Sequence, residues 1–155
     1  MRTPCCLNEC VPTGETLDLA QYVLPRIVLV NGVPGCGKTY YILKKMKVGT
    51  GDDADLALFA TREGAIDFRR RLVADKDRNL TGREPWLNQC IKTVLSFIIN
   101  GDHGRKYARV FVDEALMMHA GEILISVALA GAEVVEILGD TNQIKFINRM
   151  EQMPV

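Results

Sequence analysis

At residues 32–39 the sequence reads Gly32-Val33-Pro34-Gly35-Cys36-Gly37-Lys38-Thr39, which matches the pattern G-x-x-x-x-G-K-[ST]. A β-branched apolar run at 27–30 precedes it, and a helical pattern begins at Lys38. Glycines let a backbone turn its N–H groups toward phosphate oxygens, and a helix N-terminus adds a positive dipole. We therefore predict a phosphate cradle in which the Lys38 ammonium reaches the terminal phosphates of a nucleotide and the Thr39 hydroxyl binds Mg²⁺. Cys36 is expected to be a small filler whose side chain points away from the phosphates.

Alternating apolar and helical patterns extend outward from this loop. We predict strands at 27–30, 56–60, 93–97, 108–112 and 134–138, and helices at 38–47, 61–74 and 117–130. Residues 75–90 are predicted to be an irregular connection, and the continuous apolar run at 27–30 predicts a strand buried on both faces. The alternation predicts an α/β fold, a three-layer sandwich with a mainly parallel sheet. Right-handed crossovers then bring the carboxyl ends of the strands to one edge, where ligands bind.

Two further groups of polar residues follow predicted strands. The apolar strand at 110–112 ends on Asp113 and Glu114. Beside a phosphate cradle, the first acid is expected to hold Mg²⁺ and the second to take a proton from the attacking water, although acids also commonly decorate a helix N-terminus. Gln143 follows the last strand, in Gly139-Asp140-Thr141-Asn142-Gln143. It is placed either to contact the γ-phosphate or to form a polar turn.

Four blocks in this order resemble the superfamily 1 helicases of positive-strand RNA viruses, the alphavirus-like and tobamovirus-like replicase group. The blocks are 32–39, Ala60-Thr61-Arg62-Glu63-Gly64-Ala65, Val112-Asp113-Glu114-Ala115 and Gly139-Asp140-Thr141-Asn142-Gln143-Ile144. The resemblance implies the first RecA-like domain of a helicase, which binds ATP or GTP with Mg²⁺. It implies that Lys38 and Thr39 contact phosphates and metal, Asp113 the metal, Glu114 acts as base, and Gln143 senses the γ-phosphate.

The resemblance also implies an RNA contact. The block containing Thr61 and Arg62 is similar to one that touches the single strand in such helicases, and both side chains suit phosphate contacts. Basic runs at 69–71 and 44–47 extend this patch or form a solvated helix face. Family members continue into a second RecA-like domain whose arginines complete the site. This chain ends at Val155, so we expect it alone to be a poor NTPase and no helicase, with single-stranded RNA bound weakly.

Besides a part of a helicase enzyme, two other functions stay open at this point. The chain is either part of an enzyme or a truncated or host-retained nucleotide- and RNA-binding module without turnover. A small-molecule P-loop kinase is a third hypothesis, because the arginines at 69–71 and Arg78 are placed to imitate the arginine-rich lid of such kinases, but the block at 139–149 has no place in them. We divide the chain into a leader at 1–25 with one short helix near 17–23, a nucleotide-binding domain at 26–150, and a tail at 151–155.

Composition narrows the class of protein. The chain has 155 residues, 48% of them hydrophobic and 25% charged, as in a globular domain, and its formal net charge is +0. Any nucleic-acid surface is therefore local. Cys5, Cys6 and Cys10 are either half of a metal site or free thiols in a reducing compartment. With no apolar run near ~20 residues and no signal-peptide pattern, we expect a cytosolic protein without membrane insertion.

Overall fold

The computed structural model describes residues 25–49, 53–75, 80, 84–101 and 104–142. Its centre is a five-stranded sheet in the order β1-β5-β4-β2-β3, and all neighbouring strands are parallel. The strands are β1 (Arg26–Asn31), β2 (Leu56–Phe59), β3 (Ile91–Thr93), β4 (Arg109–Asp113) and β5 (Val134–Gly139). The α-helices are α1 (Lys38–Lys45), α2 (Arg62–Ala74), α3 (Glu84–Cys90), α4 (Val94–Asn100) and α5 (Ala120–Ala130).

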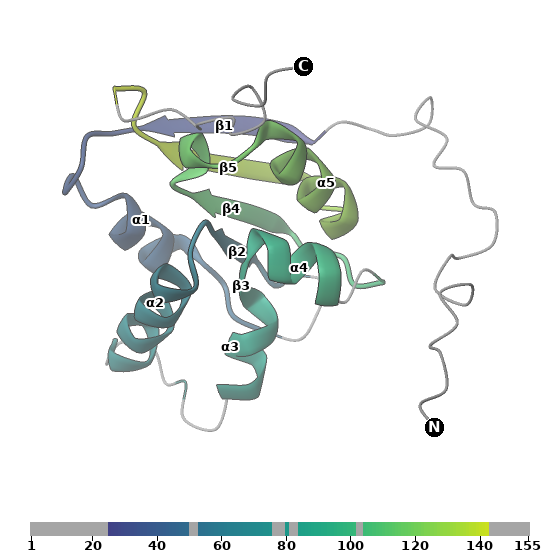
Figure 1. Cartoon of the computed structure of the whole chain (residues 1–155). Coiled ribbons are helices and arrows are strands. Elements are labelled where there is room, and N and C mark those ends of the chain that lie inside the picture. Colours follow the sequence, from purple (N-terminus) through teal and green to yellow (C-terminus); the bar gives the residue numbers. More distant parts are fainter. Residues whose placement is uncertain (1–24, 50–52, 76–79, 81–83, 102–103, 143–155) are drawn as a thin grey trace, which may run out of the picture.

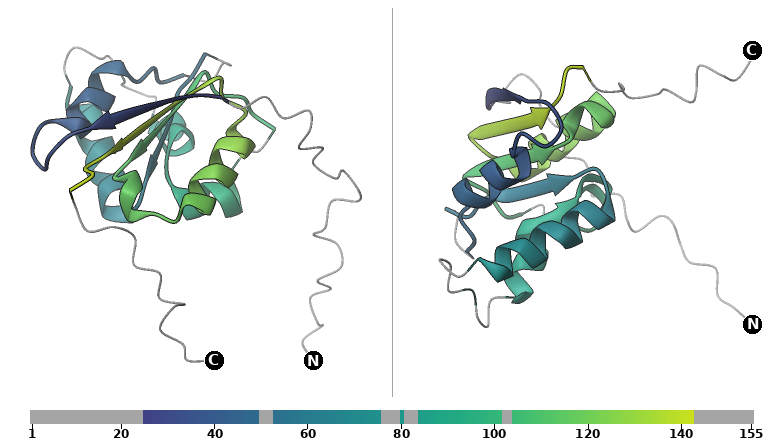
Figure 2. Two further views of the ribbon diagram at one scale, coloured as in Figure 1. Left: turned by 90° about the horizontal axis from the view of Figure 1, so that it is seen from above. Right: turned by 90° about the vertical axis from the view of Figure 1, so that its left-hand side faces the viewer.

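Helices cover both faces of the sheet, which confirms the predicted three-layer α/β fold. Helices α1, α2 and α3 lie on one side, and α4 and α5 lie on the other (Figures 1 and 2). Successive residues of the central strand β4 point to opposite faces. Phe111 therefore packs with the α1–α3 layer, whereas Val110 and Val112 pack with the α4–α5 layer. Each layer adds a fully buried phenylalanine, Phe68 from α2 and Phe97 from α4, so the sheet carries an apolar core on each face.

The strand that precedes the glycine loop lies at the edge of the sheet. Among the described residues β1 pairs only with β5. Ile27 and Leu29 are 56% and 57% exposed. The prediction that this strand is buried on both faces is therefore wrong. Its apolar residues do indicate a strand, but burial depends on the strand order and on the helix cover, which the local pattern does not contain.

The chain between α2 and β4 differs from the prediction. Residues 84–90, expected to be irregular, form α3, and residues 94–100 form α4, where the sequence predicted a strand over 93–97. Thr93 ends the short strand β3 and caps α4, because its Oγ1 accepts a hydrogen bond from the Ser96 N–H at 3.2 Å. Val94 and Phe97 are buried while Leu95 is exposed, which is helical spacing rather than strand alternation.

The carboxyl ends of four strands meet at one edge, as the sequence predicted. Asn31 is in register with Gly139, and Phe59 is in register with Asp113. The loops that follow β1, β2, β4 and β5 therefore converge there. In the described part of the chain, no helix is both long and apolar enough to cross a membrane. The proposed helix at 17–23, the cysteines at 5, 6 and 10, and the tail at 151–155 lie outside the described residues.

Candidate functional site

The glycine loop connects β1 to α1 through backbone conformations that favour glycine. Gly35 and Gly37 have φ of +79° and +91°, in the left-handed region, and Gly37 is the N-cap of α1. Gly32 is constrained differently, because a Cβ at this position would overlap the Sγ of Cys36. Cys36 therefore lies back against Gly32. The loop geometry supports the predicted strand–loop–helix cradle.

Lys38 holds the loop closed from the first turn of α1. Its Nζ donates to the carbonyl oxygens of Gly32, at 2.6 Å, and Val33, at 3.1 Å. The ammonium is thus placed beside the backbone that would face a phosphate. Carbonyl acceptors are weaker partners for an ammonium than phosphate oxygens, so a bound phosphate can compete for this group.

Thr39 and Asp113 meet although they are far apart in the sequence. The Thr39 Oγ1 donates to Oδ2 of Asp113 at 2.8 Å, and Oδ1 accepts from the Glu114 N–H at 3.1 Å. Asp113 is only 5% exposed. Burial raises the pKa of Asp113, while the hydrogen bonds from Thr39 and the Glu114 N–H, and the charge of Lys38, oppose that shift. The two oxygen-bearing side chains predicted to bind metal therefore lie together.

Glu114 leaves the strand in an unusual conformation. Its φ of 54° is the one positive value at a non-glycine residue in the described ranges, and it opens a short 3-10 turn at Ala115–Met117. The left-handed region costs a residue with a Cβ about 1–2 kcal/mol. This bend separates the two acids: Asp113 is buried against Thr39, and Glu114 is exposed. The predicted division of the pair into two positions is thus present in the backbone.

Two adjacent cavities lie at this edge, with volumes of about 250 and 290 Å³. Thr39, Arg71, Asp113 and Glu114 line both of them. One cavity extends to the glycine loop, and the other extends to the end of β2 and the first turns of α2. The loop, the acid pair and α2 therefore surround one connected recess.

Sequence reasoning missed part of this lining. Gly64, Asp67 and Arg71 all line the recess from α2. Their spacing of three and four residues places them on one stripe of the helix, which is the signal that was available. The basic run at 69–71 does not distinguish Arg71 from its two neighbours, and Asp67 belongs to none of the motifs.

The residues with predicted RNA contacts lie at the start of α2. The Thr61 Oγ1 accepts a hydrogen bond from the Gly64 N–H at 3.1 Å, which confirms that Thr61 caps the helix. Thr61 also lines one of the two cavities, and Arg62 is exposed. Their RNA contact stays a prediction.

Gln143, the expected γ-phosphate sensor, lies outside the described residues, but the residues before it are fixed to the edge of the sheet. Oδ1 of Asn31 accepts from the Thr141 N–H at 3.1 Å. Oδ1 of Asp140 accepts from the Asn142 N–H at 2.9 Å. The segment that follows β5 therefore begins next to the end of β1.

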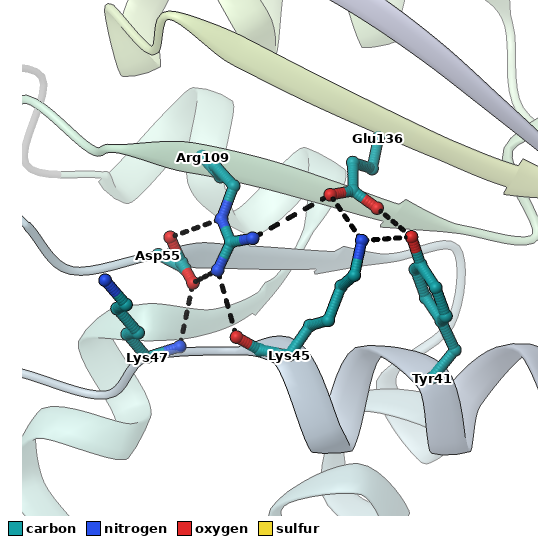
Figure 3. Close-up of polar contacts among 6 residues, drawn as sticks. All are labelled: Tyr41, Lys45, Lys47, Asp55, Arg109 and Glu136. Carbon is teal, nitrogen blue, oxygen red and sulfur yellow. Dashed lines mark hydrogen bonds and ion pairs between the residues drawn. The ribbon is translucent and has the colours of Figure 1, made fainter.

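The far end of α1 is anchored by a network of charges around two buried carboxylates, Asp55 and Glu136 (Figure 3). Arg109 on β4 contacts both carboxylate oxygens of Asp55, at 3.2 and 2.8 Å, and donates to the Lys45 carbonyl at 2.9 Å. Lys45 also contacts Glu136 on β5 at 3.5 Å, and Tyr41 donates to the same carboxylate at 2.7 Å. These bonds join α1 to β4 and β5, so they hold the helix that begins at the glycine loop.

Comparison with known proteins identifies a family of similar sequences. Residues 28–155 match the family model described as the viral superfamily 1 RNA helicase core domain. The chain is 39% identical over 137 residues to the replicase large subunit of Tobacco mosaic virus (strain OM). It is 37% identical over 131 residues to that of Tobamovirus Ob. In both comparisons the match covers 83% of this chain and 8% of the relative, so the chain spans about 8% of the length of these replicase subunits.

Proposed function

Because this chain belongs to the viral superfamily 1 RNA helicase core family, we propose that it is the nucleotide-binding part of a larger replicase and binds ATP or GTP with Mg²⁺. The observation that carries the proposal is the Thr39–Asp113 hydrogen bond of 2.8 Å beside the glycine loop. It joins the end of the phosphate cradle to the acidic end of β4. In this proposal the backbone N–H groups of residues 32–39, Pro34 excepted, hold the phosphates, and Lys38 exchanges its carbonyl partners for phosphate oxygens.

The residues at this junction fit magnesium. Mg²⁺ prefers hard oxygen ligands and is commonly held by one or two protein oxygens plus phosphates and water. The Thr39 hydroxyl and the Asp113 carboxylate supply such oxygens, and the raised pKa of Asp113 reflects a buried charge that a cation would stabilise. When bound, the metal would offset negative charge on the phosphates.

Hydrolysis would use the second acid. Glu114 is exposed at the recess while Asp113 is tied to Thr39. This leaves the Glu114 carboxylate available to accept a proton from a water molecule that attacks the terminal phosphate. We propose that efficient turnover requires a second RecA-like domain and the sensor Gln143, and that RNA contacts run through Thr61 and Arg62. The second candidate, a binding module without turnover, differs only in that final step.

Nucleotide binding is tested with the Lys38→Ala variant and a matched control. Lys47 is an exposed lysine beyond the other end of α1 and does not line the recess, so Lys47→Ala removes the same charge elsewhere. Calorimetry with Mg-ATP and Mg-GTP should show binding to the wild-type chain and to Lys47→Ala. We expect Lys38→Ala to bind about 10- to 100-fold more weakly, because it loses a charged contact to phosphate. Absence of binding by folded wild-type chain at millimolar nucleotide would refute the proposal.

Turnover is tested separately by phosphate release with and without single-stranded RNA. Phosphate release that is abolished by Glu114→Gln, while nucleotide binding persists, would support the hypothesis that the chain is part of an enzyme. Binding without any Glu114-dependent phosphate release would favour the module.

A further inference from the structure

The recess at the strand ends is lined by a second cation besides Lys38. Lys38 lines the cavity next to the glycine loop and already donates to two loop carbonyls. Arg71 reaches the recess from α2 and lines both cavities together with Thr39, Asp113 and Glu114. A phosphate held by the loop and extending toward Glu114 would therefore lie between Lys38 and Arg71.

The three consecutive arginines of α2 have different surroundings. Arg69 donates to the Ile91 carbonyl and is tied to the neighbouring strand β3. Arg70 lines a shallow apolar groove between α2 and α3. Only Arg71 of the three lines the recess, because it shares a helix stripe with Gly64 and Asp67. The run is thus not one continuous basic face, and Arg70 is a natural control for Arg71.

The present partner of Arg71 can be exchanged. Its guanidinium lies 2.7 Å from Oδ2 of Asp67, four residues earlier on the same helix, and the two side chains are 60% and 53% exposed. Exposed pairs of this kind contribute little to stability because water and salt screen them. A phosphate offers the planar guanidinium two oxygens and more charge than one carboxylate. The ion pair therefore keeps Arg71 beside the recess, and a phosphate can replace Asp67 as its partner at little energetic cost.

We propose that Arg71 leaves Asp67 and binds the terminal phosphate of the nucleoside triphosphate, so that this domain carries its own γ-phosphate arginine on α2. The inference rests on the proposed nucleotide site. It assigns the terminal phosphate because Arg71 shares both cavities with Glu114, the group proposed to act beside that phosphate. Arg71 would then distinguish triphosphate from diphosphate, and Asp67 would hold it when the terminal phosphate is absent.

The test compares four forms of the 155-residue chain: wild type, Arg71→Ala, Arg70→Ala and Asp67→Asn. Circular dichroism and thermal melting first establish that each variant is folded. Calorimetry then measures dissociation constants for the magnesium complexes of ATP, GTP, ADP and GDP. We expect Arg71→Ala to weaken triphosphate binding by about 10- to 100-fold, as for loss of a charged hydrogen bond, and diphosphate binding by less than about 3-fold. Arg70→Ala should leave both unchanged, and Asp67→Asn should leave triphosphate binding unchanged or tighter.

Several results would overturn the inference while leaving the nucleotide site intact. Equal weakening of triphosphate and diphosphate by Arg71→Ala would place the arginine elsewhere. If Arg71→Ala lost no more triphosphate affinity than Arg70→Ala, the effect would come from the overall positive charge of α2 and not from a contact made by Arg71. If Arg71→Ala instead weakened only the binding of a fluorescent single-stranded RNA, Arg71 would belong to the RNA path. If wild type bound none of the four nucleotides, the proposed function would fail and the inference with it.

Discussion

Replacing Arg109 by methionine tests whether the buried charge network stabilises the fold. The variant keeps the long apolar stem but removes both contacts to Asp55, the bond to the Lys45 carbonyl and a longer contact of 3.9 Å to Glu136. Asp55 is 0% exposed and would retain the bond from the Lys47 N–H, at 2.7 Å. Removing one partner of a buried pair typically costs about 3–5 kcal/mol, because the other charge stays buried without compensation.

The structure places this variant at the lower end of that range. The Arg109 side chain is 25% exposed, so water can reach the vacated space and solvate part of the carboxylate. We expect Arg109→Met to lower the free energy of unfolding by about 3 kcal/mol, a large fraction of the ~5–15 kcal/mol typical of a domain. The corresponding fall in Tm is roughly 6–12 °C for a chain of this size. Urea titration followed by circular dichroism measures the change.

The Arg71–Asp67 pair supplies the matched control. Its 2.7 Å contact is nearly the same length as the 2.8 Å Arg109–Asp55 contact, but its side chains are exposed. Arg71→Met should therefore cost less than about 1 kcal/mol. In the double variant Asp55→Asn/Arg109→Met the buried charge of Asp55 is gone and the amide oxygen can still accept from the Lys47 N–H, while Glu136 keeps its contacts with Lys45 and Tyr41. This variant should be more stable than Arg109→Met alone. The reasoning is refuted if Arg109→Met costs no more than Arg71→Met, or if Asp55→Asn fails to recover stability.

Three further predictions concern the recess. Because burial raises the pKa of Asp113, stability from this group is present below its unfolded pKa and is lost as pH rises through the folded one. In urea titrations without nucleotide, Asp113→Asn should then raise the free energy of unfolding at pH 7 but not near pH 3. The same substitution should weaken Mg-nucleotide binding. Lower stability of the variant at pH 7 would contradict this reasoning. Glu114→Gly should be about 1 kcal/mol more stable than Glu114→Ala, since only glycine adopts φ of 54° freely; equal stabilities would argue against strain there. Three carboxylates and two cations line the two cavities, so a triphosphate would meet net negative charge there unless a metal ion offsets it. Removing the metal with excess EDTA should therefore weaken triphosphate binding by at least about 10-fold in calorimetry. Unchanged affinity would exclude metal dependence.

The local geometry of the recess follows from the sequence where a motif fixes the backbone conformation and parallel strands bring their ends together. The pattern at 32–39 fixes a loop and a helix start, and an acid pair at a strand end fixes a bend. Parallel strands in the order β1-β5-β4 then place the residues after β1 and β4 at the same edge, where Thr39 and Asp113 meet. Arg71 was not predicted as part of the site, because its place depends on how α2 packs across β2, which the basic run does not encode.

Strand order and short apolar segments explain the errors in the fold. Residues 94–98 are rich in apolar and β-branched types, which favour a strand by composition. The cap from Thr93 to Ser96 and the burial of Val94 and Phe97 show that helical periodicity prevails. β1 has the composition of a central strand, yet within the described ranges it pairs with β5 alone, since the arrangement of the other strands decides which neighbours it has.

The placement of basic residues limits the proposed RNA binding of this chain. The formal net charge is +0, and the basic runs at 44–47 and 69–71 were candidates for a patch. Within the described residues, Lys45 is bound to Glu136 and Arg69 to the Ile91 carbonyl. Contacts to a single strand would then involve few cations, with Arg62 at the start of α2 among them. Each phosphate contact contributes about 0.7 to the salt dependence of single-strand binding. RNA affinity with a slope far steeper than about 2 would place the RNA on groups outside this edge of the sheet.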